Sequence, residues 1–234
     1  MSELDNLHDP LRLDRTLLKD MAVERLRDHI GGGLIPEGTK ITEREVSQLL
    51  GISRMPARDA LMALEHEGLV QSRPDGRYVI QLTENDVRDI LQVRAALERL
   101  AAELAALNIT DEGRALLEAR LRDLEDAVAV GDPDLCTKRD IELHRAIWQQ
   151  AKNPHLLRFL ESMVGVVFVL AQRVNYFGNG DPQRLLDEHR EVVELIVTGN
   201  APEAGRALEA ELRHALLDAL RTFRISQRVE RRER

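Results

Sequence analysis

The spacing of two short helices between Thr42 and Leu64 constrains the fold of this chain most. Thr42-Glu43-Arg44-Glu45 matches a capping box, in which the Thr hydroxyl and the second Glu carboxylate each bond a free backbone NH at a helix start. Gly51 is suited to end that helix, and Ser53 can cap another only two positions later. Two helices joined by so short a turn predict a helix-turn-helix. The helix that begins after Ser53 is the third helix of the unit, and it is expected to bury Ala57, Ala60, Leu61 and Leu64.

The flanking segments complete a winged form of this motif. Leu18, Ala22, Leu26 and Ile30 recur at helical spacing, and the glycines at 31 to 33 then stop the helix. After Gly68, the β-prone runs 69–73 and 77–80 flank the turn Pro74-Asp75-Gly76. Residues 15–80 are therefore predicted to form three helices and a small β wing, preceded by a flexible N-terminus at 1–14.

Two arginines indicate what this unit binds. Arg54 and Arg58 lie four residues apart on one face near the start of the third helix, the end that a recognition helix inserts into the major groove. An isolated pair of this kind is more often a solvated helix face, but the surrounding motif favours DNA contact. Although the chain has a net charge of -8, residues 15–80 are balanced, with ten basic and ten acidic side chains. The acidity lies mostly in the remainder of the chain.

The segment "ITEREVSQLLGISRMPARDALMALEHEGLVQSRPDGRYVI" resembles the DNA-binding domain of the GntR family of bacterial regulators. The resemblance implies DNA contacts from Arg44, Ser53, Arg54, Arg58 and Gly76. Arg73 and Arg77 are also basic side chains near the wing tip, and they suit contact with a phosphate or the minor groove. The common Arg-Gly order at the wing tip is reversed here, since Gly76 precedes Arg77.

The rest of the chain is punctuated by helix-start signals. Thr83, Thr110, Asp132, Asn153, Asp181 and Asn200 each place a capping side chain before an apolar-periodic stretch, and Pro follows most of them in the first turn. Six helices with short connections predict an all-α bundle at 83–223, so the fold class is mostly α. An Arg-rich tail at 224–234 is expected to be solvated.

Composition narrows the class of protein. Leu and Ala are abundant and only 3% of residues are aromatic, as in soluble helix-rich proteins. The longest apolar run, Met163–Ala171, is too short to cross a bilayer, and the acidic N-terminus has no apolar signal core. The single cysteine, Cys136, has no internal disulfide partner. A cytoplasmic protein without a membrane partner is expected.

Histidines on three of the predicted helices suggest a metal site. Asp140 and His144 share one face of the third bundle helix, and His189 and His214 precede apolar residues at helical spacing on the fifth and sixth. Each histidine alone is more often a core or rim residue, and the sequence alone does not bring the three together. Three imidazoles and a carboxylate around a cavity would suit a first-row transition metal.

The segments "VRAALERLAAELAA", "RDIELHRAIWQQAKNPHL" and "DEHREVVELIVTGNAPEAGRALEAELRHALLDAL" resemble the FCD effector-binding domain of the FadR subfamily. The resemblance implies a divalent metal, with Zn or Ni preferred, on Asp140, His144, His189 and His214. It also implies a small carboxylate effector, for which Arg94 is a candidate anchor, although Arg94 can equally pair with Glu98. Dimerisation through the bundle would match a palindromic operator.

The sequence thus predicts a DNA-binding transcriptional regulator, with a repressor preferred, whose operator binding responds to an organic acid at a metal site. A metal sensor, in which the metal itself is the signal, is the alternative. A metal-dependent enzyme is disfavoured, because no motif supplies a general base and an enzyme of this size has no need of the N-terminal unit.

Overall fold

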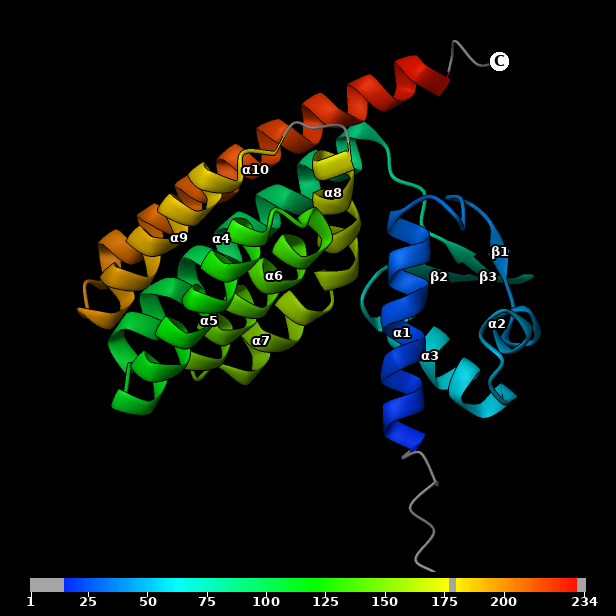
Figure 1. Ribbon diagram of the computed structural model, residues 1–234, viewed down its shortest axis with the longest axis horizontal. Helices are drawn as coiled ribbons and strands as arrows, with labels where there is room; N and C mark the ends of the chain where they lie inside the picture. Colours follow the sequence, from blue (N-terminus) through cyan, green and yellow to red (C-terminus); the bar gives the residue numbers. More distant parts are fainter. Residues whose placement is uncertain (1–14, 177–179, 231–234) are drawn as a thin grey trace, which may run out of the picture. The chain divides into compact units, whose positions relative to one another are not determined.

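The computed structural model describes residues 15–176 and 180–230. The chain divides into two compact units, Met1–Ile80 and Gln81–Arg234 (Figure 1). The predicted flexible N-terminus at 1–14 lies outside the described residues.

The first unit is a winged helix-turn-helix, as predicted. Its helices are α1 (Arg15–Gly31), α2 (Glu43–Leu50) and α3 (Arg54–His66), and its strands are β1 (Lys40–Ile41), β2 (Val70–Arg73) and β3 (Gly76–Val79). The strands form one antiparallel sheet in the order β1-β3-β2. β1 was not predicted, because two residues are too few to show a strand pattern.

Local chemistry sets the helix boundaries of this unit. Thr42 and Glu45 form the reciprocal capping box at the start of α2, and Gly51 ends that helix in the left-handed conformation with φ of 65°. Ser53 occupies the N-cap of α3, but its side chain makes no capping hydrogen bond. The hydroxyl therefore stays available to another partner. Apolar side chains of α1, α2 and α3 close the core, including Leu26, Val46, Ala57, Ala60, Leu61 and Leu64.

The second unit is all α, as predicted, and contains one helix more than the six expected. Within the described residues its helices are α4 (Glu84–Asn108), α5 (Asp111–Val130), α6 (Pro133–Gln150), α7 (Pro154–Glu161), α8 (Val164–Tyr176), α9 (Pro182–Val197) and α10 (Ala201–Glu230). The stretch after Asn153 forms both α7 and α8. The break lies at Ser162 and Met163, where Ser162 is the C-cap of α7 and its hydroxyl donates to the carbonyl oxygen of Phe159 at 2.7 Å.

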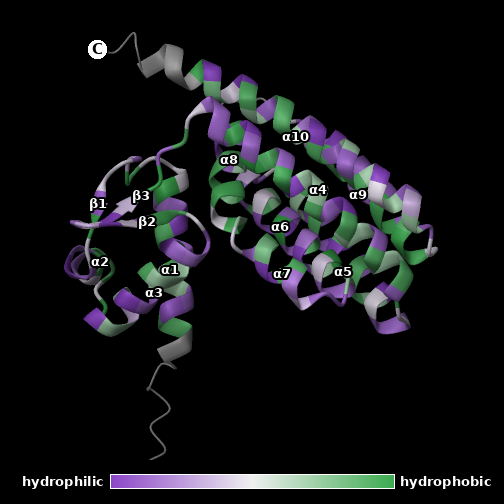
Figure 2. Ribbon diagram, turned by 180° about the vertical axis from the view of Figure 1, so that it is seen from behind, coloured by the Kyte–Doolittle hydropathy of each residue, from purple (hydrophilic) through white to green (hydrophobic). Residues whose placement is uncertain are grey.

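Five of the predicted caps are present as hydrogen bonds. The side chains of Thr83, Thr110, Asp132, Asn153 and Asp181 each accept a backbone NH in the first turn of the helix that follows. Figure 2 shows hydrophobic and hydrophilic residues interspersed along these helices, and all seven described helices contribute buried hydrophobic side chains to one core. The long helices α4 and α10 pack along each other, so residues more than a hundred positions apart share one core.

The most apolar helix, α8, belongs to this core, since most of its side chains from Val164 to Leu170 are buried. No single helix in the described ranges is long and apolar enough to cross a membrane. The bent pair of α7 and α8 passes that test only by combined length and composition. The expected cytoplasmic location remains a prediction.

The predicted Arg-rich tail begins as the last turns of α10, where the Arg224 side chain is 59% exposed, and its solvation stays a prediction. α10 continues to Glu230, and the Arg224 guanidinium donates to Glu84 Oε1 on α4 at 2.7 Å. This contact ties the end of α10 to the start of α4. Residues 231–234 lie outside the described part of the chain.

Candidate functional site

Three of the four predicted metal ligands lie together in the second unit. α6 places Asp140 and His144 one turn apart, and α9 brings His189 against them. His144 Nε2 and His189 Nε2 are 3.3 Å apart, and Asp140 Oδ1 lies 3.1 Å from His189 Nε2 and 3.7 Å from His144 Nε2. A metal about 2.1 Å from each donor would hold neighbouring donors about 3.0 to 3.4 Å apart. The spacing of these atoms fits a metal ion.

The partners of the two imidazoles decide which ring atoms face the cluster. His189 Nδ1 lies 2.8 Å from the carbonyl oxygen of Leu185, which can only accept a hydrogen bond. His144 Nδ1 lies 2.5 Å from Glu98 Oε2. Both Nδ1 atoms are therefore the protonated ones in a neutral ring, which leaves a lone pair on each Nε2. Carboxylate or carbonyl partners of this kind commonly orient metal-binding histidines.

Glu98 joins this cluster to a wider buried network. Its carboxylate is fully buried and accepts hydrogen bonds from Arg94 Nε at 2.5 Å, Trp148 Nε1 at 2.9 Å and the His144 ring. Burial alone would raise the pKa of Glu98, but the Arg94 charge and the bonds from His144 and Trp148 hold it at about 2. Glu98 is thus ionised and serves as an acceptor.

Arg94 has the ion-pair role that the sequence left open, with only 7% of its side chain exposed. Its guanidinium also lines the cavity described below, so an effector contact stays a prediction.

His214, the fourth predicted ligand, does not join the cluster. Its side chain is 47% exposed, and its Nδ1 lies 2.6 Å from Glu188 Oε1. Glu211, one turn earlier on α10, is directed inward instead. Only 4% of its side chain is exposed, and its Oε2 lies 4.0 Å from His144 Nε2. Within the described residues, Glu211 Oε2 and Asp140 Oδ1 are buried without a hydrogen-bond partner.

The charges of this centre favour a bound cation. With Glu98, Asp140 and Glu211 ionised, three carboxylates face one guanidinium, that of Arg94. Burial raises the pKa of Glu211. Burial alone would lower the pKa of His189, but Asp140 raises it to about 9. Without a metal, protons on Glu211 and His189 thus offset part of the negative charge of the carboxylates. A divalent ion would offset the same charge, with the carboxylate oxygens and the imidazole nitrogens as its ligands.

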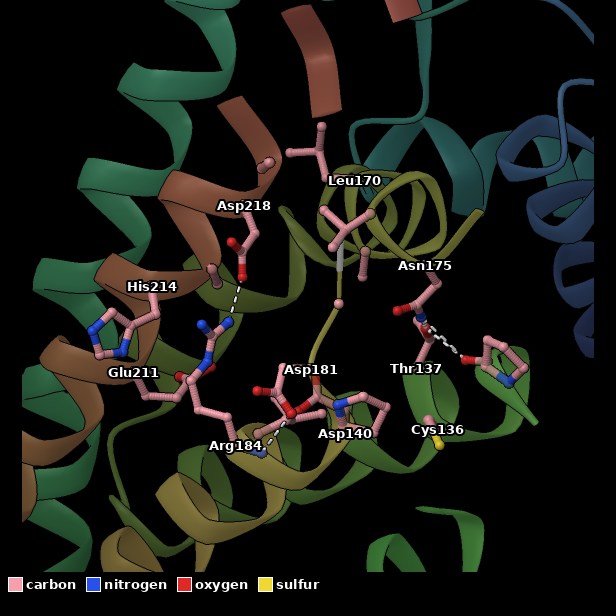
Figure 3. A pocket seen from close by; sticks show the side chains of 18 of the residues that line it. Cys136, Thr137, Asp140, Leu170, Asn175, Asp181, Arg184, Glu211, His214 and Asp218 are labelled. Carbon is pink, nitrogen blue, oxygen red and sulfur yellow. Dashed lines mark hydrogen bonds and ion pairs between the residues drawn. The ribbon is translucent and has the colours of Figure 1, made fainter. Parts of the chain in front are cut away.

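A cavity of about 300 Å³ opens beside the centre (Figure 3). Asp140, Glu211 and Arg94 belong to its wall, together with apolar side chains of α6, α8 and α10. Arg184 reaches into it and forms an ion pair with Asp218. The Nε of Arg184 is buried and has no hydrogen-bond partner in the described ranges. Asn175 also lines the cavity and donates to Thr137 Oγ1 at 2.8 Å.

The predicted DNA-contacting residues of the first unit lie mostly on its surface. Arg44, Ser53, Arg54 and Arg58 are all exposed on α2 and at the start of α3. Arg58 is 57% exposed, and its Nε lies 3.9 Å from Glu43 Oε1 on α2. A surface hollow between these helices and the wing is lined by Arg44, Arg54, Arg73, Gly76 and Arg77.

Arg77, predicted to contact DNA near the wing tip, is 27% exposed and pairs with two acidic side chains of the same unit. Its guanidinium lies 3.5 Å from Glu43 Oε1 on α2 and 3.3 Å from Glu65 Oε2 on α3, so it braces the wing against the helices. Arg73 is the exposed basic side chain of the wing, and its guanidinium lies 4.6 Å from the centre of the Tyr78 ring. Gly76 is the first residue of β3, directly after the turn at Pro74 and Asp75, and has φ of 146°.

Comparisons with known proteins match both units. Residues 18–80 match the family described as bacterial regulatory proteins, gntR family, and residues 89–214 match the FCD domain. The chain belongs to the GntR family, in the group that carries an FCD domain. This organisation is consistent with the FadR subfamily.

Individual relatives of this GntR protein are named as regulators. A probable D-xylose utilization operon transcriptional repressor of Paenarthrobacter nicotinovorans is 30% identical over 202 residues, which cover 84% of this chain and 86% of that protein. The uncharacterized HTH-type transcriptional regulator YdhC of Bacillus subtilis is 29% identical over 192 residues, covering 81% and 85%. The structure of E. coli McbR/YncC shares the fold, with a TM-score of 0.70, 18% identity and coverage of 84% and 93%.

Membership of this family confirms the prediction of a DNA-binding transcriptional regulator and not an enzyme. GntR regulators bind operator DNA through the winged unit. The individual DNA contacts, the metal, the effector and the dimer stay predictions.

Proposed function

We propose that this GntR regulator represses transcription as a homodimer on a palindromic operator, and that a small organic acid bound beside a metal centre changes its operator affinity. One observation carries the proposal: ligand atoms of Asp140, His144 and His189 lie within 4.8 Å of one another, and Asp140 also lines a cavity of about 300 Å³. A volume of this size suits a small metabolite.

On the DNA side, Arg54 and Arg58 are the residues proposed to read bases. An arginine in the major groove can bind guanine through two hydrogen bonds, worth about 1 to 3 kcal/mol of discrimination. Arg44, Ser53 and the wing residue Gly76 are proposed to contact the DNA backbone. Arg77 is proposed to hold the wing in place through its ion pairs with Glu43 and Glu65. A two-fold dimer would present one recognition helix to each half-site.

On the effector side, a bound divalent metal would supply an electrophile for a carboxylate oxygen. The chain's own residues are proposed to orient the rest of the ligand. Arg184 offers a buried Nε at the cavity wall that makes no hydrogen bond and lies 4.0 Å from Glu188 Oε1. Arg94 is proposed to act mainly by holding Glu98, and through it the His144 ring. The D-xylose operon named for the Paenarthrobacter relative supports a small hydroxylated metabolite as the effector class.

The cavity also favours an organic ligand over the metal as the signal, since a pure metal sensor has no use for it. The test follows binding of the protein to DNA from upstream of its own gene by fluorescence anisotropy, with metal-stripped and metal-replete protein. D-gluconate, D-xylonate, L-lactate and succinate are added in turn. We expect one acid to change the dissociation constant by about 5- to 150-fold, and only in metal-replete protein.

Two results would count against the proposal. If adding metal alone produces the whole change in operator affinity, the protein is a metal sensor. If operator affinity is unchanged by every acid at saturating concentration, the protein does not respond to organic acids and that part of the proposal is wrong. Metal binding is measured in a separate titration, so this result leaves the metal centre to its own test.

A further inference from the structure

We infer that Glu211, and not His214, is the fourth protein donor of the metal centre, so that the centre consists of two imidazoles and two carboxylates. Its selectivity is thereby shifted toward metals that favour oxygen ligands, such as Mn²⁺. The inference rests on the metal centre of the proposed function and concerns which residues form it.

The position of each side chain supports this assignment. Glu211 Oε2 is buried, lacks a hydrogen-bond partner in the described part of the chain and lies 4.0 Å from His144 Nε2. The His214 ring is half exposed, and its Nδ1 already faces Glu188. Both side chains project from α10 and line the cavity of Figure 3, but of these two described residues only Glu211 has a side-chain oxygen near His144. A ligand must reach the two Nε2 atoms, and Glu211 is the α10 residue close to them.

The register of α10 explains the difference. Three residues advance an α-helix by about 300°, which leaves positions 211 and 214 about 60° apart around the axis. The neighbours Leu208 and Leu212 are buried, whereas Arg213 is 70% exposed and Leu217 is 48% exposed. Glu211 therefore lies on the inward face with Leu208 and Leu212, and His214 lies at its edge.

A structural role alone does not account for a buried Glu211. A buried polar group without a hydrogen-bond partner costs about 1 to 3 kcal/mol. Arg94 is the nearby cation, but its Nε donates to Glu98 and not to Glu211. Asp140 Oδ1, across the same cluster, lies 3.1 Å from His189 Nε2. Two carboxylate oxygens facing two imidazole nitrogens match the donor set of a divalent metal.

The donor set bears on which metal binds. Imidazole suits Zn, Cu, Fe and Ni, whereas carboxylates suit Mn and Mg. Replacing one imidazole of a three-histidine site by a carboxylate therefore raises the affinity for Mn²⁺ relative to Ni²⁺. The ratio of the two affinities is the informative quantity, because nitrogen and oxygen sites in general bind Ni²⁺ more tightly than Mn²⁺.

Trp148, the one tryptophan of the sequence, provides the measurement. Its Nε1 donates to Glu98, which also bonds His144, so its fluorescence is expected to respond to metal at the centre. Metal-stripped full-length protein is titrated with MnCl₂ and NiCl₂, and calorimetry gives the stoichiometry. The variants are E211Q and H214Q, which make the same type of change three residues apart on one helix. Circular dichroism verifies that each is folded.

We expect E211Q to weaken binding of both metals at least about 10-fold and H214Q to change it less than about threefold. The reverse order, or wild-type affinity in E211Q, would overturn the inference. E211H supplies a second test if E211Q fails to fold, with an expected rise of at least about 10-fold in Ni²⁺ affinity relative to Mn²⁺. An unchanged ratio in E211H would also overturn it. Absence of binding to wild-type protein would refute the metal centre itself, which separates the two failures.

Discussion

Replacing Glu98 by Gln tests the electrostatic account of the centre. Glu98 and Arg94 form an ion pair on α4 with side-chain exposures of 0% and 7%. The same helix carries Arg99 and Glu103, an i,i+4 pair of the same residue types that is 45% and 30% exposed. E98Q and E103Q therefore make one chemical change in a buried and in an exposed pair.

The two variants should differ widely in stability. Removing one partner of a buried pair costs about 3 to 5 kcal/mol, because the other charge stays buried. In metal-stripped protein Asp140 and Glu211 still attract Arg94, so we expect the lower end of this range. An exposed pair contributes about 0 to 1 kcal/mol. At about 2 to 4 °C per kcal/mol for a domain of this size, E98Q should melt about 6 to 12 °C lower and E103Q at most about 4 °C lower.

Thermal unfolding followed by Trp148 fluorescence is the suitable assay, since this residue lies in the second unit and reports on it alone. The midpoint of the transition is compared at constant protein concentration without metal. If E98Q and E103Q melt within about 2 °C of each other, the buried ion pair does not stabilise the fold more than the exposed pair does. The conclusion that Glu98 is ionised would then be wrong.

Two further predictions concern the DNA-binding unit. Arg58→Ala should weaken operator binding about 5- to 150-fold by loss of base contacts and leave the melting midpoint unchanged, whereas the exposed control R25A keeps wild-type affinity by anisotropy. Undiminished operator protection by the R58A protein would refute this role. Gly76→Ala should cost about 1 to 3 kcal/mol in urea unfolding followed by circular dichroism, because φ of 146° is strained for alanine and its Cβ would lie 2.6 Å from Lys40 Cε. An unchanged midpoint would contradict the strain at this turn.

Features of the fold that depend on local chemistry were predictable from the sequence. Each capping side chain bonds a backbone NH no more than three residues further along the chain, so the helix start is visible in the local sequence. This holds for the capping box at Thr42 and for the caps at Thr83, Thr110 and Asp132. The break between α7 and α8 was missed because Ser162, without a proline or glycine beside it, is a weak signal for a helix boundary. The position of this break is determined by how the apolar side chains of both helices pack into the core. The order of residues in the sequence does not show that packing.

The site was only partly predictable for a similar reason. Asp140 and His144 share one turn of α6, but the choice between Glu211 and His214 depends on the rotation of α10 by about 60°. The apolar stripe of α10 is wider than 60°, so the sequence pattern does not show which of the two side chains faces the centre. Glu98 was missed as a partner of His144, from which it is 46 positions distant in sequence. The available signal was its place among Leu91, Ala101, Ala102 and Ala105, where a carboxylate interrupts a buried stripe of α4.

The centre links four helices through charge, and this predicts where binding is felt. Its groups come from α6, α9 and α10, and Glu98 connects them to α4, the first helix after the DNA-binding unit. A divalent ion would remove the repulsion among Asp140, Glu211 and Glu98 and so strengthen the packing of α4. Hydrogen exchange should therefore slow in α4 around Glu98 on adding metal, whereas α5, which supplies no charged group to the centre, serves as an internal control. Equal slowing in α4 and α5 would indicate general stabilisation of the unit, and no slowing in α4 would contradict this route from the centre to the helix.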